Sequence, residues 1–169
     1  MKNSSLVILV CLLCYSCSRS VYVVRHAEKI TATDTLSKAV INDPPLSDAG
    51  KVRAIVLKDE MAGKHIRHIY STNTIRTMST AEPLSREIHV NRESYSNTDS
   101  LVDLIKNTKG NILVIAHSNT IDDIVNKLCG KKRIMTDLKE TEYDNLFVIR
   151  FRGRRISFAQ HKYGYPSNP

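Results

Sequence analysis

The chain has 169 residues, of which 41% are hydrophobic and 25% are charged, a composition that fits one compact domain and leaves no room for two of ordinary size. Lysine and arginine outnumber aspartate and glutamate by 25 to 17, which gives a formal net charge of +8. Such a balance suits an anionic substrate or an acidic membrane surface. No interleaved basic and aromatic face supports binding to nucleic acid.

The first 17 residues differ from the rest of the chain and indicate export. Lys2 supplies a positive charge, and residues 6–14 form an unbroken apolar run. Because a membrane-spanning helix needs roughly 20 apolar residues, this run is too short to cross a bilayer and suits the apolar region of a secretory signal. The alternative is that the run forms a buried strand or helix of the domain.

The residues after the apolar run resemble the lipoprotein box of exported bacterial proteins, in which a small residue precedes a cysteine that becomes lipidated. Ser16 precedes Cys17, although Cys14 stands where leucine is common, so ordinary signal cleavage stays open as an alternative. We therefore expect residues 1–17 to be a signal or lipoprotein segment that places the protein in the bacterial envelope, in the periplasm or at the cell surface. Residues 18–169 would then form a single domain without a disulfide framework.

From residue 21 onward, short β-rich runs alternate with longer helical patterns, which indicates strand-helix-strand units around a largely parallel sheet. The expected strands cover residues 21–25, 66–70 and 111–116, and the expected helices cover residues 47–63, 74–88, 100–106 and 118–130. Residues 146–151 and 156–161 are typical of a hairpin that would complete the sheet at an edge. Residues 131–145 carry no clear pattern.

Local signals add detail to two of these helices. Ser47 is expected to cap the first one, with Val52, Ile55 and Val56 on its apolar face. Pro83 should kink or interrupt the second one, because proline has no amide hydrogen and crowds the carbonyl group one turn back.

Two histidines, His26 and His117, each follow directly after an expected buried strand. In open α/β sheets, ligands bind at the edge formed by the carboxyl ends of the strands. A single histidine at such a place would more often be structural and held by a backbone carbonyl. A pair, of which one lies beside Arg25 and the other opens a helix, indicates a functional site.

Two arginines are candidates for binding an anion at this edge. The planar guanidinium of Arg25 or Arg76 can hold two phosphate oxygens at once, and its charge offsets that of a phosphoryl group. Arg76 also lies near the start of a helix, where free amide hydrogens and the helix dipole favour an anion. Taken alone, Arg76 would be interpreted as a solvated charge on the helix surface.

Four segments together resemble the histidine phosphatase superfamily, also called phosphoglycerate mutase-like. They are residues 23–28 (VVRHAE), 45–50 (PLSDAG), 70–81 (YSTNTIRTMSTA) and 115–118 (IAHS). The resemblance keeps order and spacing and covers nearly all of residues 21–161. It implies an α/β fold of three layers, with a mainly parallel central sheet and an antiparallel edge hairpin.

The resemblance also implies roles for the matching residues. His26 would be the nucleophile, and Arg25, Arg76 and His117 would hold the phosphate. Ala27 stands where the family usually has glycine, a small-for-small change that should leave the pocket open. In chemical terms, a neutral imidazole can attack phosphorus if its other nitrogen is held by a carbonyl, and water then hydrolyses the phosphohistidine. No set of metal ligands stands out, so we expect neither a metal nor another cofactor.

The general acid that would protonate the leaving group is harder to place. Family members often take it from the interval that here holds Glu93, Asp99 and Asp103, and Glu28 beside the nucleophile is a fourth candidate. We choose Asp99 over Glu93, although Asp99 could instead cap the helix that follows and Asp103 should face solvent. A weak or missing acid would favour phosphohistidine or other activated phosphates.

The sequence thus predicts an exported phosphatase, independent of metal, that acts on a phosphorylated small molecule or a phosphoprotein. One alternative is a phosphotransferase of the phosphoglycerate mutase type, which the short chain and the export segment disfavour. Another is a phosphate-binding lipoprotein without turnover. Four arginines near the expected hairpin could contact acidic lipid or a polyanion, or could simply be solvated. They are Arg150, Arg152, Arg154 and Arg155.

Overall fold

The computed structural model describes residues 18–31 and 42–167. The expected export segment, with Cys17 at its end, lies outside these residues. None of the helices in the described part of the chain is long and apolar enough to cross a membrane.

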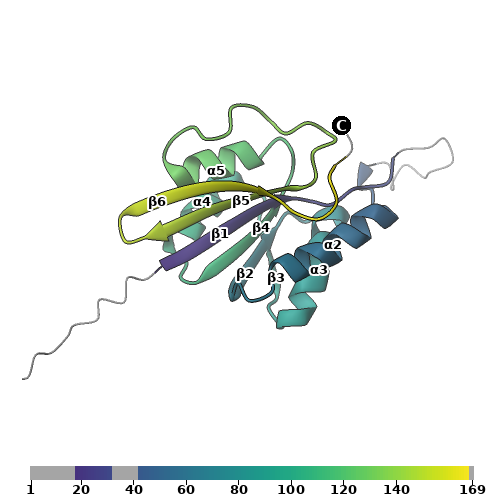
Figure 1. The fold of residues 1–169 in the computed structure, drawn as a ribbon, viewed down its shortest axis with the longest axis horizontal. Coiled ribbons are helices and arrows are strands. Elements are labelled where there is room, and N and C mark those ends of the chain that lie inside the picture. Colours follow the sequence, from purple (N-terminus) through teal and green to yellow (C-terminus); the bar gives the residue numbers. More distant parts are fainter. Residues whose placement is uncertain (1–17, 32–41, 168–169) are drawn as a thin grey trace, which may run out of the picture.

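Within the described residues, six strands form one mixed sheet with helices on both faces (Figure 1). In chain order the elements are β1 (Ser18–Arg25), α2 (Asp48–Glu60), β2 (Ile66–Ser71), α3 (Ile75–Ile88), β3 (Arg92–Ser94), α4 (Thr98–Asn107), β4 (Asn111–Ala116), α5 (Ile121–Cys129), β5 (Asn145–Arg152) and β6 (Arg155–Lys162). The strand order is β3-β2-β4-β1-β5-β6. Strands β1 to β4 are parallel to one another, and β5 and β6 form the antiparallel edge pair.

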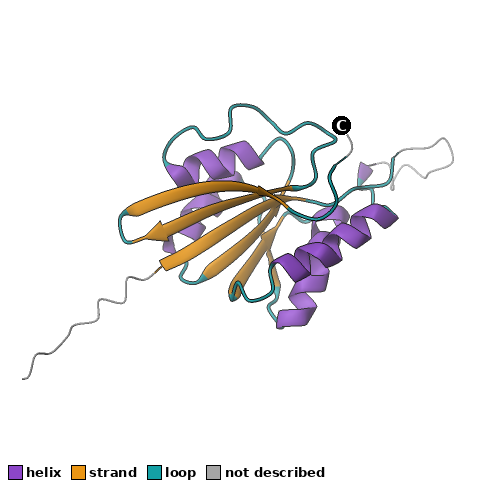
Figure 2. Cartoon of the chain, viewed as in Figure 1, coloured by secondary structure: helices purple, strands orange, loops and turns teal. Residues whose placement is uncertain are grey.

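The helices lie in two layers, with α2 and α3 on one face of the sheet and α4 and α5 on the other (Figure 2). Strand β1 shows why its sequence is a continuous apolar run. Val21 and Val23 pack into the core beneath α4 and α5, whereas Tyr22 and Val24 pack into the core beneath α2 and α3. A strand buried on both faces needs apolar residues at every position. The predicted three-layer α/β fold is confirmed.

The cap predicted for α2 is confirmed, two other local predictions are wrong, and the interruption expected at Pro83 does not occur. The side chain of Ser47 caps α2 by accepting a hydrogen bond from the Gly50 amide at 3.2 Å. The apolar face predicted for α2 is wrong, because Val52 and Ile55 are about half exposed. Helix α3 runs through Pro83 without interruption. Helix α4 begins at Thr98 rather than at residue 100, because the Asn97 side chain caps it.

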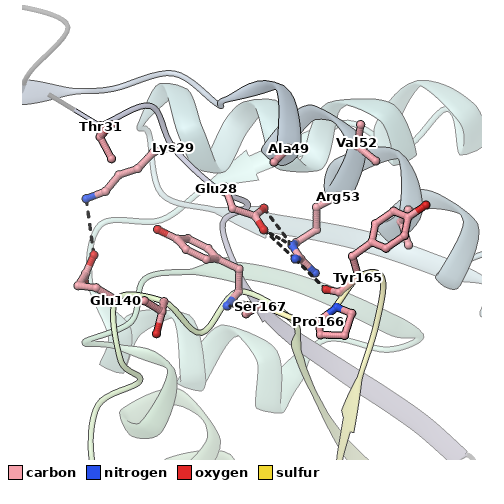
Figure 3. Close-up of a pocket in the computed structure, with 13 residues that line it drawn as sticks. Glu28, Lys29, Thr31, Ala49, Val52, Arg53, Glu140, Tyr165, Pro166 and Ser167 are labelled. Carbon is pink, nitrogen blue, oxygen red and sulfur yellow. Dashed lines mark hydrogen bonds and ion pairs between the residues drawn. The ribbon is translucent and has the colours of Figure 1, made fainter. Parts of the chain in front are cut away.

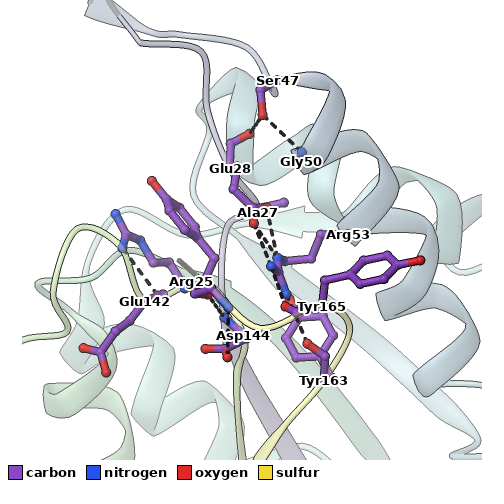
Figure 4. A network of polar contacts seen from close by, with 12 residues as sticks. Arg25, Ala27, Glu28, Ser47, Gly50, Arg53, Glu142, Asp144, Tyr163 and Tyr165 are labelled. Atoms are coloured by element: carbon purple, nitrogen blue, oxygen red, sulfur yellow. Dashed lines mark hydrogen bonds and ion pairs between the residues drawn. The ribbon is translucent and has the colours of Figure 1, made fainter. Parts of the chain in front are cut away.

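The buried face of α2 is built around an ion pair that the helical pattern did not indicate. Arg53 is only 5% exposed, and its Nε and Nη2 donate to the Glu28 carboxylate at 2.7–2.9 Å. Its two Nη atoms also donate to the carbonyls of Tyr163 and Tyr165 (Figure 4). Arg53 therefore ties α2 to the loop after β1 and to the C-terminal segment.

Glu28→Ala is expected to lower the free energy of unfolding by about 3 kcal/mol, because it leaves the Arg53 charge buried without its carboxylate. The side chain of Glu28 keeps 21% exposure, which places the effect at the lower end of the range for buried pairs. Urea denaturation measures it. The control is Lys51→Ala, which breaks the solvent-exposed pair with Asp48 on the same helix and should change little. Equal urea midpoints for the two variants would show that the ion pair of Arg53 with Glu28 does not stabilise the fold.

Candidate active site

The ring of His26 is held by the backbone at the carboxyl end of β1. Its amide donates to the Ala116 carbonyl at 2.9 Å, which continues the pairing of β1 with β4. Its Nδ1 lies 2.8 Å from the carbonyl oxygen of Ala27. Since a carbonyl can only accept, Nδ1 must carry the proton, which leaves Nε2 with a free electron pair. This tautomer is the one that nucleophilic attack from Nε2 requires.

The segment around the N-cap of α2, residues 45–50, keeps the loop after His26 in place. The Ser47 amide donates to the Glu28 carbonyl at 2.9 Å, and the Ile30 amide donates to the Pro45 carbonyl at 3.0 Å. A Cβ atom at Gly50 would lie 2.0 Å from the Glu28 carbonyl oxygen, so this close approach requires glycine. The PLSDAG segment, residues 45–50, thus supports the loop that follows His26 (Figure 4).

Ala27 fits its position without strain on its surroundings. It is fully buried and forms a small apolar cluster with Leu46 and Ala54. Its amide donates to Thr80 Oγ1 on α3 at 2.9 Å. The fold therefore accommodates alanine at the position where the family usually has glycine.

His117 lies at the end of β4, the strand next to β1, and its ring centroid is 5.4 Å from that of His26. Its Nδ1 is 3.5 Å from Nη2 of Arg76 and its Nε2 is 2.8 Å from Thr72 Oγ1. Because a guanidinium can only donate, Nδ1 is the acceptor and Nε2 donates to the threonine. The two histidines therefore face each other with opposite tautomers.

The two arginines reach the site from different elements. Arg25 is 1% exposed, stacks on the Tyr143 ring with Cζ 4.1 Å from its centroid, and donates to the carbonyls of Lys139 and Glu140. Arg76, in the first turn of α3, donates to Asp43 Oδ1 at 3.1 Å. The Nε atoms of both arginines are buried without a hydrogen-bond partner among the described residues. Arg76 is therefore not a solvated helix charge.

All four predicted phosphate-site residues line a single hollow of about 560 Å³. Besides Arg25, His26, Arg76 and His117, its lining consists of Lys29, Ser118, Asn119, Asp137, Leu138 and Glu140. The convergence follows from topology, because β1 and β4 are adjacent parallel strands that pair Arg25 with Ala116 at their ends. The structure thus brings the four side chains together, and their catalytic roles stay predictions.

Both histidines are neutral in this arrangement. Burial lowers the pKa of His26 to about 3. The charge of Arg25 also lowers this pKa, whereas the hydrogen bond with the Ala27 carbonyl raises it. Burial and the charge of Arg76 lower the pKa of His117 to about 4. A bound phosphate would supply the opposite charge and raise both pKa values.

The ring-proton NMR signals of His26 and His117 are expected to stay constant between about pH 8 and about pH 5 in the ligand-free protein, because both pKa values lie below that range. The control is the unfolded chain, in which every histidine should titrate at about pH 6.5. A midpoint of about 6 or higher for either residue in the folded protein would contradict the neutral pair.

The structure does not bring the predicted general acid to the hollow. Asp99 lies in the first turn of α4, where it is 73% exposed and forms an ion pair with Lys127 at 2.7 Å. Glu93 lies on β3, 3.7 Å from His68, and Asp103 pairs with Lys106 on the surface. None of these three carboxylates is part of the lining. The choice of Asp99 therefore has no geometric support.

Glu28, the fourth candidate, turns toward a second hollow of about 680 Å³. There its carboxylate is bound to Arg53, as Figure 3 shows. Side chains of α2 and the C-terminal segment, among them Val52, Val56 and Tyr165, give this hollow a mostly apolar wall. It adjoins the first hollow through Lys29 and Glu140, which line both.

Glu140 is the main residue that the sequence did not indicate. Its Oε2 is 3.0 Å from Nη2 of Arg25 and 3.7 Å from Nζ of Lys29, and its Oε1 accepts from Ser118 Oγ at 3.1 Å. Burial alone would raise the pKa of this carboxyl, but the charge of Arg25 and the hydrogen bond from Ser118 hold it below the usual range. The patternless stretch 131–145 offered no signal for it. An ionised carboxylate thus occupies part of the predicted anion site.

The family model of the histidine phosphatase superfamily, branch 1, matches residues 21–101, which include Arg25, His26 and Arg76. Over these residues the chain matches the histidine phosphatase superfamily. No curated protein matches its sequence. Its α/β fold is the one that the motifs predicted.

Solved structures of similar fold cover nearly the whole domain. The putative phosphohistidine phosphatase SixA from Agrobacterium tumefaciens is 17% identical, with a TM-score of 0.60 over 87% of this chain and 97% of that one. Phosphoglycerate mutase from Bacillus anthracis is 17% identical, with a TM-score of 0.60 over 86% and 93%. The ecdysone phosphate phosphatase of Bombix mori, in complex with tungstate, is 16% identical, with a TM-score of 0.59 over 89% and 94%. These likenesses establish the fold.

Proposed function

We propose that the protein hydrolyses phosphomonoesters or phosphohistidine through a covalent phosphohistidine on His26. The observation that carries the proposal is the Nδ1 contact of His26 with the Ala27 carbonyl, which leaves Nε2 as an unprotonated nucleophile in an arginine-lined hollow. The fold is shared with the protein histidine phosphatase SixA and an ecdysone phosphate phosphatase. Phosphatase chemistry therefore fits both the site and the family.

The reaction has two steps. In the first, Nε2 of His26 forms a bond to phosphorus while the bond to the leaving oxygen or nitrogen breaks, and the leaving group takes the electron pair. In the second, water attacks the phosphohistidine, releases inorganic phosphate and returns His26 to its neutral form. Arg25, Arg76 and His117 would stabilise the charge on the transferring oxygens, because phosphoryl transfer depends mainly on positioning and electrostatics.

The proton for the leaving group limits the choice of substrate. The carboxylates in the lining are Asp137 and Glu140, and Glu140 is held in its ionised form by Arg25. Leaving groups that need little protonation, such as an aryl oxide or an imidazole, therefore suit this site best. The apolar wall of the second hollow lies next to the phosphate position and favours an apolar leaving group.

No metal has a part in this proposal. The described residues contain no group of three or more histidine, cysteine, aspartate or glutamate side chains that could hold a metal ion. A fragment from Ser18 onward, which contains every described strand and helix, is expected to hydrolyse an aryl phosphate in the presence of a chelator. Absence of hydrolysis by the folded fragment, with or without added metal, would overturn the proposal.

A phosphate-binding protein without turnover is the second candidate, and the ion pair of Glu140 with Arg25 favours it. Vanadate binding without any release of phosphate from an ester would support this candidate. A phosphotransferase of the mutase type would instead move the phosphate to an acceptor, so a product assay separates it from hydrolysis.

Glu140→Gln is expected to strengthen competitive inhibition by inorganic phosphate about three- to fivefold. The change removes an anion that competes for Arg25 and Lys29, and the size is modest because the Glu140 side chain remains 69% exposed. The matched control is Glu142→Gln in the same loop, whose carboxylate accepts a hydrogen bond from the Lys139 amide at 2.8 Å. Weaker inhibition in Glu140→Gln would instead make Glu140 a supporting residue of the site.

We also propose that the protein is exported and carries a lipid on Cys17, which would anchor it to the bacterial envelope. The apolar run at residues 6–14 and the Ser16-Cys17 pair support this proposal. Metabolic labelling of the full chain with palmitate tests it, with Cys17→Ala as the unlabelled control. Secretion of an unlabelled wild-type protein would favour ordinary signal cleavage.

A further inference from the structure

The first described residue lies beside the tip of the edge hairpin. Ser18, which follows Cys17 directly, pairs with Arg152 at the end of β5. Arg152 in turn pairs with Arg155, the first residue of β6. Figure 1 shows the start of β1 and the turn between β5 and β6 at the same end of the molecule. A group attached to Cys17 is therefore joined to the chain one residue before this paired position.

This end of the molecule is densely basic. Arg150, Arg152, Arg154 and Arg155 are all exposed, and within the described ranges no side-chain hydrogen bond or ion pair engages them. Exposed Lys109 lies just before β4, the parallel neighbour of β1, and so belongs to the same edge. We call these five residues the basic end. Isoleucine 156, beside Arg155, adds an apolar side chain that is 41% exposed.

The basic end and the active site lie at opposite ends of β1. The strand begins at Ser18 and ends at Arg25, and eight residues at about 3.3 Å each put roughly 25 Å between them. The arginines of the basic end therefore cannot touch a phosphate group held in the hollow. Their charge needs another partner, and the attachment point of the proposed lipid is next to them.

We propose that the basic end docks on the acidic headgroups of the bilayer that holds the lipid anchor. Arginine side chains near an anionic membrane surface attract it strongly, and a single acyl chain alone gives only reversible binding. The docked orientation points the active-site hollow away from the bilayer, open to substrate. The inference rests on the proposed lipid anchor, which would bring the protein to the bilayer. Binding of the basic end to acidic headgroups can be tested on a protein without the anchor, and independently of catalysis.

The test is co-sedimentation of the fragment from Ser18 onward with vesicles, either phosphatidylcholine alone or an equal mixture with phosphatidylglycerol. Binding is expected only to the acidic vesicles and should fall at high salt. Arg154→Glu/Arg155→Glu should weaken it about 30-fold or more, since each arginine lost removes about fivefold and each glutamate added repels the surface. Hydrolysis of an aryl phosphate should be unchanged in this variant.

The matched control is Lys51→Glu/Lys139→Glu. It makes the same change in net charge near the opposite end of β1, where the loop after His26 lies. It should bind acidic vesicles almost as the unchanged fragment does. Equal binding to neutral and acidic vesicles, or an equal loss in both double variants, would overturn the proposal, as would retention of the fragment by nucleic acid but not by vesicles. Palmitate labelling and aryl phosphate hydrolysis report separately on the anchor and on the phosphatase.

Discussion

Histidine 26→Ala is expected to lower kcat for an aryl phosphate by about 10³-fold or more, because the variant has no atom that can form the covalent intermediate. Inorganic phosphate should still bind, since Arg25, Arg76 and His117 remain. The measurement is steady-state hydrolysis together with competition by phosphate. Loss of turnover with retained binding separates the nucleophile from the residues that hold the anion.

The control for this variant is His161→Ala, which removes an exposed histidine on the edge strand β6 and should leave kcat unchanged. Because His26 is 3% exposed, thermal unfolding of His26→Ala must show a folded protein before its activity is interpreted. His26→Asn keeps a side chain of similar length and should be equally inactive. Substantial turnover by either folded variant would mean that another group attacks phosphorus.

Arginine 76→Ala is expected to lower kcat about 10²- to 10³-fold, the range found when one preorganised donor to a developing charge is removed. Its Nη2 lies 3.5 Å from Nδ1 of His117 and its side chain is 18% exposed, so its charge acts in a partly water-excluded site. Arg76→Lys keeps the charge but loses the planar fork, and should recover only part of the rate. Steady-state kinetics with one aryl phosphate measures all three proteins.

Arg86→Ala is the matched control, because Arg86 is on the same helix, is 79% exposed and pairs only with Glu82 among the described residues. It should change neither kcat nor KM. If Arg76→Ala raised KM and left kcat intact, Arg76 would bind substrate and transition state equally and would not stabilise transfer.

The parts of the site that the sequence could predict are those governed by sheet topology. A run such as 21–25 must be buried on both faces, and residues that follow adjacent parallel strands must meet at one edge. His26 and His117 could therefore be predicted to lie close together. The arginines needed the family motif in addition, because nothing in the helical pattern distinguishes an inward Arg76 from a solvated one.

The parts that could not be predicted depend on contacts between distant segments. Arg53 was hidden in the pattern of α2, because its burial depends on Glu28 and on carbonyls more than 100 residues away. The position of Asp99 depends on which residue caps α4. Asn97 is the cap, so Asp99 lies in the first turn of the helix. Glu140 lies in a stretch without secondary structure, where no periodicity links sequence to position.

The proposed mechanism requires a covalent phosphate on one ring nitrogen of His26. Mass spectrometry of the protein, denatured in alkali within one turnover of an aryl phosphate, tests it directly, because phosphohistidine survives there. We predict one phosphoryl group on the peptide that contains His26, absent in the asparagine variant. Turnover with no phosphorylated peptide, or with the group on another residue, would contradict it.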